Sequence, residues 1–441
     1  MAQILPFHAL RYNTAGHPLA DLLTQPYDKI TPAMQKAYYE RDPYNLVRFE
    51  LGMAGAADSE TDNVYTRAKS FLAKAKADGV LQRDEKPAIY AYAQRFENPA
   101  KAGEWIERRG FLALGRIHNY DEGVVYRHEQ TLDGPKADRA KLLATARTHS
   151  GQIFMLYEDP ALAIDKLLWG QLEGRTPQAT ITDEYGVENS LWVVDDPQLI
   201  GAVAGAMSDK RLIIADGHHR YETALRYRDQ QGAGDGKAPH DYVLMTFVNQ
   251  NAPGLVVLPT HRVVFGLENF DQAALQSRLE EYFHVAPARG GTDVNQVLGE
   301  LQEAGIGGSA LALTGKNGSL ILRARHDAVE KALADEHPLR RKLDVVLLHK
   351  IILEKVLGLS QESINQQRNI HYHRSAASAL TELEKGANCV FLLNPTPMAA
   401  MRDLSYAGEV MPQKSTDFYP KLLSGLALYE LDGGFAQPNS K

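Results

Sequence analysis

The residues best suited to chemistry form the run Asp216-Gly-His-His-Arg220. The apolar stretch 212–215 precedes it and predicts a strand, Gly217 permits a tight turn, and a helix is expected from Tyr221. This order places backbone N–H groups and the positive end of a helix beside two imidazoles and a guanidinium. Such donors suit a phosphate group, which Arg220 can bind through two parallel hydrogen bonds. The run therefore predicts an anion site.

Two other interpretations of the same run stay open. Asp216 ends the predicted strand, where open α/β sheets gather ligands, and with His218 and His219 it offers a carboxylate and two imidazoles to a metal ion. Consecutive histidines tend to diverge, however, and no His-x-x-x-His pair supports them here. The run can also be a structural turn. We favour the anion site over both.

A second charged cluster, residues 127–139, reads Arg-His-Glu-Gln-Thr-Leu-Asp-Gly-Pro-Lys-Ala-Asp-Arg. Lys136 and Arg139 offer cations to a polyanion, and His128 or Glu129 can transfer protons. The alternative is a solvated charged loop that caps the helix expected over residues 137–149. Charged loops usually have that structural role.

Four further polar motifs are weaker candidates. Residues 411–421 contain Lys414-Ser-Thr between prolines, but they lack the glycine-rich loop of a Walker motif, so a structural loop is the alternative. Gln25-Pro-Tyr-Asp28 and Pro259-Thr-His-Arg262 are short polar turns of the kind that usually serve packing. His371-Tyr-His-Arg374 can point two imidazoles to one face of a strand. Because no third ligand stands nearby in the sequence, we interpret this motif as structural.

Composition limits the class of protein. The chain has 441 residues, a net charge of −7, 44% hydrophobic residues and one cysteine, Cys389, so an intrachain disulfide and a cysteine-based metal site are excluded. An acidic balance argues against nucleic-acid binding. The N-terminus lacks the pattern of a signal peptide, and no apolar stretch reaches the ~20 residues that span a bilayer. We therefore expect a cytoplasmic protein without membrane contact.

Alternating strand-like and helix-like segments predict a mixed α/β fold, in three lobes over residues 1–175, 176–268 and 269–441. The last lobe is expected to return its tail to the active site. The expected strands cover residues 45–51, 88–92, 109–117, 152–157, 191–194, 212–215, 242–248 and 389–393, with a hairpin over 310–323 that turns at Lys316-Asn-Gly318. The expected helices cover residues 60–79, 137–149, 199–207 and 221–230. No Gly-x-Ser-x-Gly or Gly-x-Gly-x-x-Gly motif supports a serine hydrolase or a dinucleotide fold.

At these motifs the sequence resembles a bacterial family catalogued as a domain of unknown function, number 1015. The resemblance extends over nearly the whole chain, and the stretches that carry it are Gln25-Pro-Tyr-Asp28, Asn45-Leu-Val-Arg48, Arg109-Gly-Phe-Leu-Ala-Leu114, His128-Glu-Gln-Thr131 with Gly134-Pro-Lys136, residues 215–221, Leu258-Pro-Thr-His-Arg262 and Met411-Pro-Gln-Lys-Ser-Thr416. The run Asp-Gly-His-His-Arg also resembles the signature of free serine kinases, whose fold is shared by ParB and sulfiredoxin.

This resemblance implies a phosphotransferase that acts on a small hydroxyl metabolite, with L-serine the expected acceptor and a nucleotide or pyrophosphate the donor. Asp216 would be a base or an Mg²⁺ ligand, and the candidates for the separate glutamate of the kinases are Glu129 and Glu222. The implied catalytic residues are Asp216, His218 and Glu129; the phosphate-binding residues are His219, Arg220, Lys136, Arg139, Lys414 and Ser415; the substrate-binding residues are His128, Thr131, Tyr27, Asp28 and Arg262. An exchangeable Mg²⁺ and no tightly bound organic cofactor are expected.

Two rival functions use the same residues. A binding protein that senses a nucleotide or a phosphorylated metabolite would need the cations but not Asp216. A metal-dependent hydrolase would hold a tightly bound ion.

Overall fold

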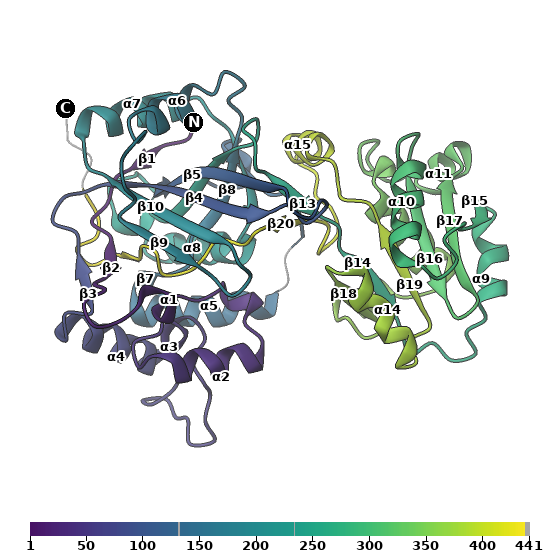
Figure 1. Cartoon of the computed structure of the whole chain (residues 1–441), viewed down its shortest axis with the longest axis horizontal. Helices are drawn as coiled ribbons and strands as arrows, with labels where there is room; N and C mark the ends of the chain where they lie inside the picture. Colours follow the sequence, from purple (N-terminus) through teal and green to yellow (C-terminus); the bar gives the residue numbers. More distant parts are fainter. Residues whose placement is uncertain (131–132, 233, 437–441) are drawn as a thin grey trace. The chain divides into compact units, whose positions relative to one another are not determined.

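The computed structural model describes residues 1–130, 133–232 and 234–436 (Figure 1). The chain forms two compact units, one made of residues 1–126, 132–255 and 420–441, the other of residues 127–131 and 256–419. We call them unit 1 and unit 2. The predicted mixed α/β class is confirmed, whereas the division into three lobes stays a prediction.

Unit 1 is built on a nine-stranded mixed sheet in the order β6-β11-β8-β12-β5-β4-β10-β9, with β1 paired to β5. Helices α6 and α7 lie on one side of this sheet and α1 to α5 on the other (Figure 1). The strands of unit 1 are β1 Ile4–Leu5, β2 Leu10–Tyr12, β3 Leu81–Arg83, β4 Ile89–Glu97, β5 Trp105–Arg116, β6 Val125–Tyr126, β7 Thr148–His149, β8 Ile153–Tyr157, β9 Ala179–Thr182, β10 Glu188–Val194, β11 Leu212–Asp216, β12 Tyr242–Asn249 and β21 Tyr429–Glu430. Its helices are α1 Leu19–Leu22, α2 Pro32–Arg41, α3 Val47–Glu50, α4 Val64–Ala77, α5 Asp133–Ala146, α6 Ala163–Gly170, α7 Pro197–Met207 and α8 His218–Gln230, with 3-10 turns at Tyr27–Lys29, Tyr120–Glu122 and Pro239–Asp241.

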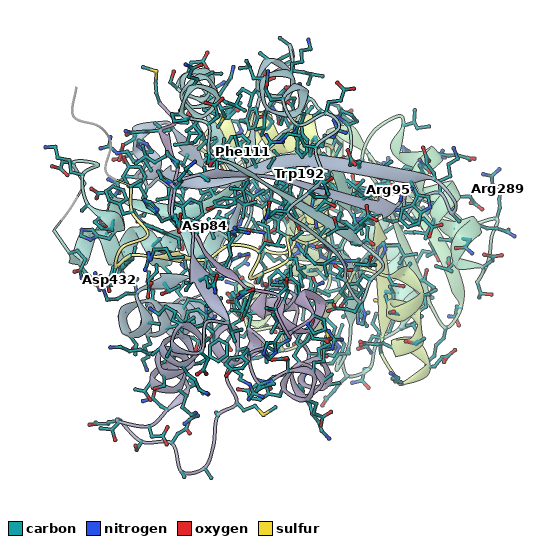
Figure 2. All side chains as sticks on the ribbon, turned by 60° about the vertical axis from the view of Figure 1, so that its left-hand side comes forward. Asp84, Arg95, Phe111, Trp192, Arg289 and Asp432 are labelled. Atoms are coloured by element: carbon teal, nitrogen blue, oxygen red, sulfur yellow. The ribbon has the colours of Figure 1, made fainter. Side chains whose placement is uncertain are left out.

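A large hydrophobic cluster of unit 1 joins this sheet to helices α6, α7 and α8. Phe111 of β5 is buried there and stacks on Phe247 of β12, with ring centroids 5.2 Å apart. Phe111 and Trp192 lie among densely packed side chains (Figure 2). Because β4, β5, β8 and β12 are buried on both faces, their apolar runs are continuous rather than alternating.

Unit 2 has a six-stranded sheet in the order β15-β17-β16-β19-β14-β18 and a two-stranded pair, β13 with β20. The predicted hairpin over 310–323 is confirmed, and Gly318 at its turn has a φ of 98°. The strands are β13 Val256–Leu258, β14 His261–Val264, β15 Phe283–Pro287, β16 Ala310–Gly315, β17 Gly318–Ala324, β18 Ile370–His373, β19 Cys389–Leu393 and β20 Asp417–Tyr419. The helices are α9 Gln272–Leu279, α10 Val294–Gly305, α11 His326–Ala332, α12 Asp344–Val346, a π-helix Leu347–Val356, α13 Gln361–Asn365, α14 Ala376–Glu384 and α15 Met398–Tyr406, with a 3-10 turn at Arg340–Lys342.

The strand predicted over residues 45–51 is wrong, because Val47–Glu50 forms the helical turn α3. The Asn45 side chain accepts a hydrogen bond from the Val47 N–H at 2.9 Å, which starts a turn where apolar content suggested an extended strand. No helix among the described residues combines the length and apolar character needed to span a membrane.

Candidate functional site

The centre of the site is the junction between β11 and α8 in unit 1. The register between β11 and β8 shifts between Ile214 and Asp216, so the end of the strand is irregular. Gly217 follows with a φ of 91°, a left-handed conformation that favours glycine. A Cβ atom there would lie 3.2 Å from the guanidinium of Arg220. The predicted strand, turn and helix are therefore confirmed, and α8 begins at His218, three residues earlier than expected.

Asp216 is held between two cations. Its Oδ1 accepts a hydrogen bond from Lys421 Nζ, and its Oδ2 accepts one from the Arg220 guanidinium, both at 3.3 Å. Burial by itself raises the pKa of Asp216, but Lys421, Arg220 and Lys29 outweigh it and hold the pKa well below its ordinary value. The carboxylate is therefore ionised at neutral pH.

Arg220 and Arg139 line the same small cavity, which has a volume of about 40 Å³. Arg220 donates to the Gln152 carbonyl, and Arg139 donates to the Glu50 carbonyl at 2.8 Å. Tyr27 lies under Arg139, with 4.3 Å between the guanidinium carbon and the ring centroid. The two predicted phosphate-binding arginines thus meet in unit 1, in a space of water-molecule size.

Lys136 contacts helix α8, which follows the Asp216 junction. Its Nζ lies 2.6 Å from the carboxylate of Glu222, so the ion pair ties α5 to α8 one turn after the Asp216 junction. His218 is buried, His219 is partly buried, and Asp28 is exposed. Of the two glutamates proposed from the resemblance, Glu222 belongs to this helix.

The other predicted residues gather in unit 2. Glu129 accepts hydrogen bonds from the backbone N–H groups of Lys414, at 2.6 Å, and Ser415, at 3.2 Å. His128 shares a hydrogen bond of 2.7 Å with the Thr416 hydroxyl. Glu129 therefore caps a turn in which Lys414 has a positive φ of 58°. Thr131 lies outside the described residues.

Arg262 is buried beside this turn and donates to the Lys414 carbonyl at 3.0 Å. Burial lowers its pKa to about 10, and the smaller opposing effects of Tyr372 and of the Glu129 carboxylate only partly offset this desolvation. Arg262 and Ser415 both line a cavity of about 700 Å³ in unit 2, a volume typical of small-molecule sites. Asp344, also on its wall, has a pKa raised to about 7 by burial.

The structure thus brings the predicted residues together in two sets, Asp216, Arg220, Arg139, Lys136 and Tyr27 in unit 1, and His128, Glu129, Arg262, Lys414 and Ser415 in unit 2. Convergence of Lys414 on the Asp216 junction stays a prediction. Sequence reasoning missed Lys421 and Lys29 as partners of Asp216, and Glu50 as a partner of Arg139 and Ser150. Lys421 ends the 411–421 stretch, Lys29 follows Asp28, and Glu50 lies two positions after Arg48, so their closeness to these motifs was the available signal.

Comparison with known proteins identifies the family. The fold and site define a mixed α/β protein with a partly buried carboxylate held by cations at a strand end. The chain belongs to the family described as Protein of unknown function (DUF1015), whose model matches residues 4–346, which confirms the resemblance. No curated protein matches it.

Several solved structures are similar at low identity. A conserved hypothetical protein from Pyrococcus furiosus is 16% identical, with 74% of this chain and 97% of that chain covered and a TM-score of 0.36. A free serine kinase in complex with AMP is 15% identical, with 72% and 92% covered and a TM-score of 0.35. At these values the likeness carries no argument about the activity of this chain.

Proposed function

We propose that this protein is a phosphotransferase that transfers a phosphoryl group to a small hydroxyl metabolite, with free L-serine as the acceptor and a nucleotide or pyrophosphate as the donor. The observation that carries the proposal is the Asp216 carboxylate, ionised and held 3.3 Å from both Lys421 and Arg220 at a strand end. Phosphoryl transfer requires positioning and charge neutralisation more than covalent help from the protein.

The charges suit this reaction. Lys421, Arg220, Lys29 and Arg139 supply positive charge for the donor phosphates, while Asp216 supplies the single carboxylate that an acceptor hydroxyl requires. The hydroxyl oxygen forms a bond to phosphorus as the bond from phosphorus to the leaving phosphate oxygen breaks. Asp216 accepts the hydrogen bond of the hydroxyl, and the proton passes on to water.

The low pKa of Asp216 makes it a weak base, which limits its role. In a loose transition state the hydroxyl needs little deprotonation before the phosphoryl group has left its donor, so orientation by a weak base is sufficient. We therefore assign Asp216 the role of orienting the hydroxyl. His218 and His219, at the start of α8, are proposed to contact the phosphates.

The expected Mg²⁺ fits less well as a ligand of Asp216. Each carboxylate oxygen already accepts a hydrogen bond from a cation, so a metal ion would have to displace Lys421 or Arg220. We propose that any Mg²⁺ arrives bound to the donor phosphates and exchanges with them. Such a reaction, with soluble donor and acceptor, fits the expected cytoplasmic location.

The test is a donor screen. Purified protein is incubated with L-serine, Mg²⁺ and either ATP, ADP or pyrophosphate, and O-phosphoserine is detected by mass. We expect phosphoserine with at least one donor and its loss in Asp216→Asn, while the exposed control Asp209→Asn keeps full activity. Absence of phosphoserine with all three donors would reject the serine kinase assignment.

A second candidate, a protein that binds a nucleotide or phosphorylated metabolite without catalysis, is favoured by the 700 Å³ cavity of unit 2. It would bind ADP through that cavity whether or not Asp216 is present. Calorimetric titration of wild-type protein and Asp216→Asn with ADP separates the two, because ADP binding without turnover in both proteins supports the binding role.

A further inference from the structure

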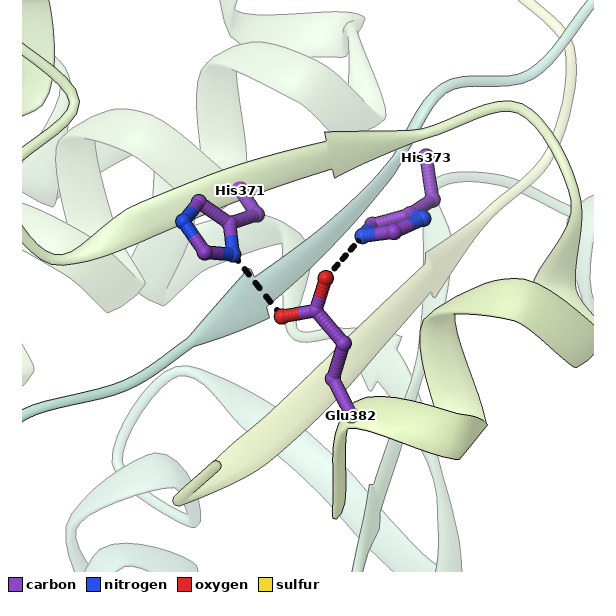
Figure 3. A group of neighbouring side chains, drawn as sticks. All are labelled: His371, His373 and Glu382. Atoms are coloured by element: carbon purple, nitrogen blue, oxygen red, sulfur yellow. Dashed lines mark hydrogen bonds and ion pairs between the residues drawn. The ribbon is translucent and has the colours of Figure 1, made fainter. Parts of the chain in front are cut away.

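Two histidines and a glutamate of unit 2 form a cluster outside the proposed phosphotransfer site. His371 and His373 stand on β18, and Glu382 stands on α14 (Figure 3). His371 Nδ1 lies 2.8 Å from one carboxylate oxygen of Glu382, and His373 Nε2 lies 2.6 Å from the other. One ligand atom from each residue lies within 4.8 Å of the other two. Among the described residues this is the one such group of three.

Backbone geometry explains why the three side chains meet. His371 and His373 are alternate residues of a strand, so both point to the same face of the sheet. Strand β18 pairs with β14, and α14 is capped by the Ser375 hydroxyl, which accepts a hydrogen bond from the Ser378 N–H at 3.3 Å. Ala376 and Ala379 of α14 are buried against the sheet, which fixes the helix and carries Glu382 to the imidazoles.

The two imidazoles are the side-chain partners of the Glu382 carboxylate. Arg374, which follows His373, forms its ion pair with Asp417. The His371 side chain is 50% exposed, which gives solvent and small molecules access to the cluster.

We propose that His371, His373 and Glu382 bind a divalent first-row transition-metal ion, with zinc the expected ion. Imidazole nitrogens with one carboxylate favour zinc, iron or manganese over Mg²⁺ and Ca²⁺, which prefer oxygen ligands. Three protein ligands leave at least one coordination position for water or a substrate, as catalytic metal sites require. The proposal does not depend on the phosphotransferase assignment, because all three ligands belong to unit 2.

The cluster needs only a small adjustment to hold the ion. Zinc bonds to nitrogen and oxygen of about 2.0–2.1 Å place tetrahedral ligand atoms about 3.3 Å apart. The two hydrogen-bonded contacts would therefore lengthen by about half an ångström, which side-chain rotation about the long Glu382 stem provides. The ion takes the place of the two protons that now lie between the nitrogens and the carboxylate, and those protons go to solvent or to the other ring nitrogens.

The rival explanation is that Glu382 only ties α14 to β18 through two hydrogen bonds. It predicts that removing one histidine changes stability and has no effect on metal affinity. The two explanations therefore differ in a direct metal titration.

The probe is Co²⁺, which reports its own coordination through visible absorption. The full chain is titrated as wild type, His371→Ala, Glu382→Gln and the control His284→Ala, which removes an exposed histidine of β15 in the same unit. Circular dichroism checks that each variant is folded, and Glu382→Gln keeps the shape of the side chain. A thermal melt with and without Co²⁺ gives a second readout.

We expect one Co²⁺ per wild-type chain and a raised melting temperature. Loss of a ligand should weaken binding by more than the ~10–100-fold that loss of an outer-shell partner costs, and His284→Ala should bind like wild type. Absence of stoichiometric binding by the wild type would overturn the proposal. Equal binding by His371→Ala and Glu382→Gln, or an equal loss in His284→Ala, would overturn it as well.

Discussion

Asp216→Asn should destabilise unit 1, because it removes the carboxylate that compensates two largely buried cations. The side chains of Lys421 and Arg220 are 8% and 13% exposed, and that of Asp216 is 24% exposed. Removing one partner of a fully buried ion pair costs roughly 3–5 kcal/mol. Both contacts are long, at 3.3 Å, and Asp216 has some access to water, so we expect a loss of about 1–3 kcal/mol in the free energy of unfolding.

Tryptophan fluorescence during urea unfolding measures this loss in the correct unit, because Trp105, Trp169 and Trp192 all belong to unit 1. Lys421→Met provides the complementary variant and should cost less, since Asp216 keeps Arg220 and an apolar side chain replaces the buried ammonium. Asp209→Asn, at a side chain that is 73% exposed, should change the midpoint by less than about 0.5 kcal/mol. A midpoint for Asp216→Asn equal to that of Asp209→Asn would refute the reasoning.

Three further predictions concern the same elements. Gly151→Ala should weaken inorganic phosphate binding in calorimetry, because its Cβ would lie 2.9 Å from the Arg220 guanidinium, whereas Gly201→Ala, with no atom within 4 Å, should leave binding unchanged. Lys414→Gly should keep or raise the free energy of unfolding by up to about 1 kcal/mol, because the φ of 58° strains a residue with a side chain. Urea unfolding measures this change. A loss of stability would show that the Lys414 side chain contributes more than that strain costs. Burial lowers the pKa of His149 to about 4, below its unfolded value of ~6.5. The unfolded chain therefore binds more protons between these two values, and stability should fall by up to about 2.5 kcal/mol from pH 6.5 to pH 4. His149→Gln should flatten that slope in denaturation at successive pH values, and an unchanged slope would contradict the assignment.

Sequence patterns predicted the strands and helices that are regular and apolar. The segments 212–215 and 242–248 are continuous apolar runs, so β11 and β12 could be placed from composition alone. The strand prediction for residues 45–51 is wrong because the side chain of Asn45 accepts a hydrogen bond from the backbone. That bond favours a turn over a strand. Local apolar content contains no information about that bond.

The candidate sites show the same limit. The Asp216 run was recognisable because its residues are adjacent in sequence, whereas Lys421 comes from more than 200 positions away and reaches Asp216 only through the fold. The His-x-His motif at 371–373 was interpreted as structural for want of a third ligand, and Glu382 supplies it from the next helix. Spacing along a strand predicts two ligands on one face, but only the packing of α14 identifies the third.

The most direct test of the phosphotransfer proposal is a single comparison of product formation and donor binding in wild-type protein and Asp216→Asn. Phosphoserine is quantified by mass under the conditions of the active donor, and the affinity for that donor is measured by calorimetry on the same preparations. The proposal predicts that Asp216→Asn binds the donor with an affinity near that of the wild type. Because the acceptor hydroxyl loses the group that orients it, the variant should form at least ~100-fold less phosphoserine. Equal phosphoserine formation by the two proteins would contradict the role of Asp216 and with it the site on which the proposed function depends.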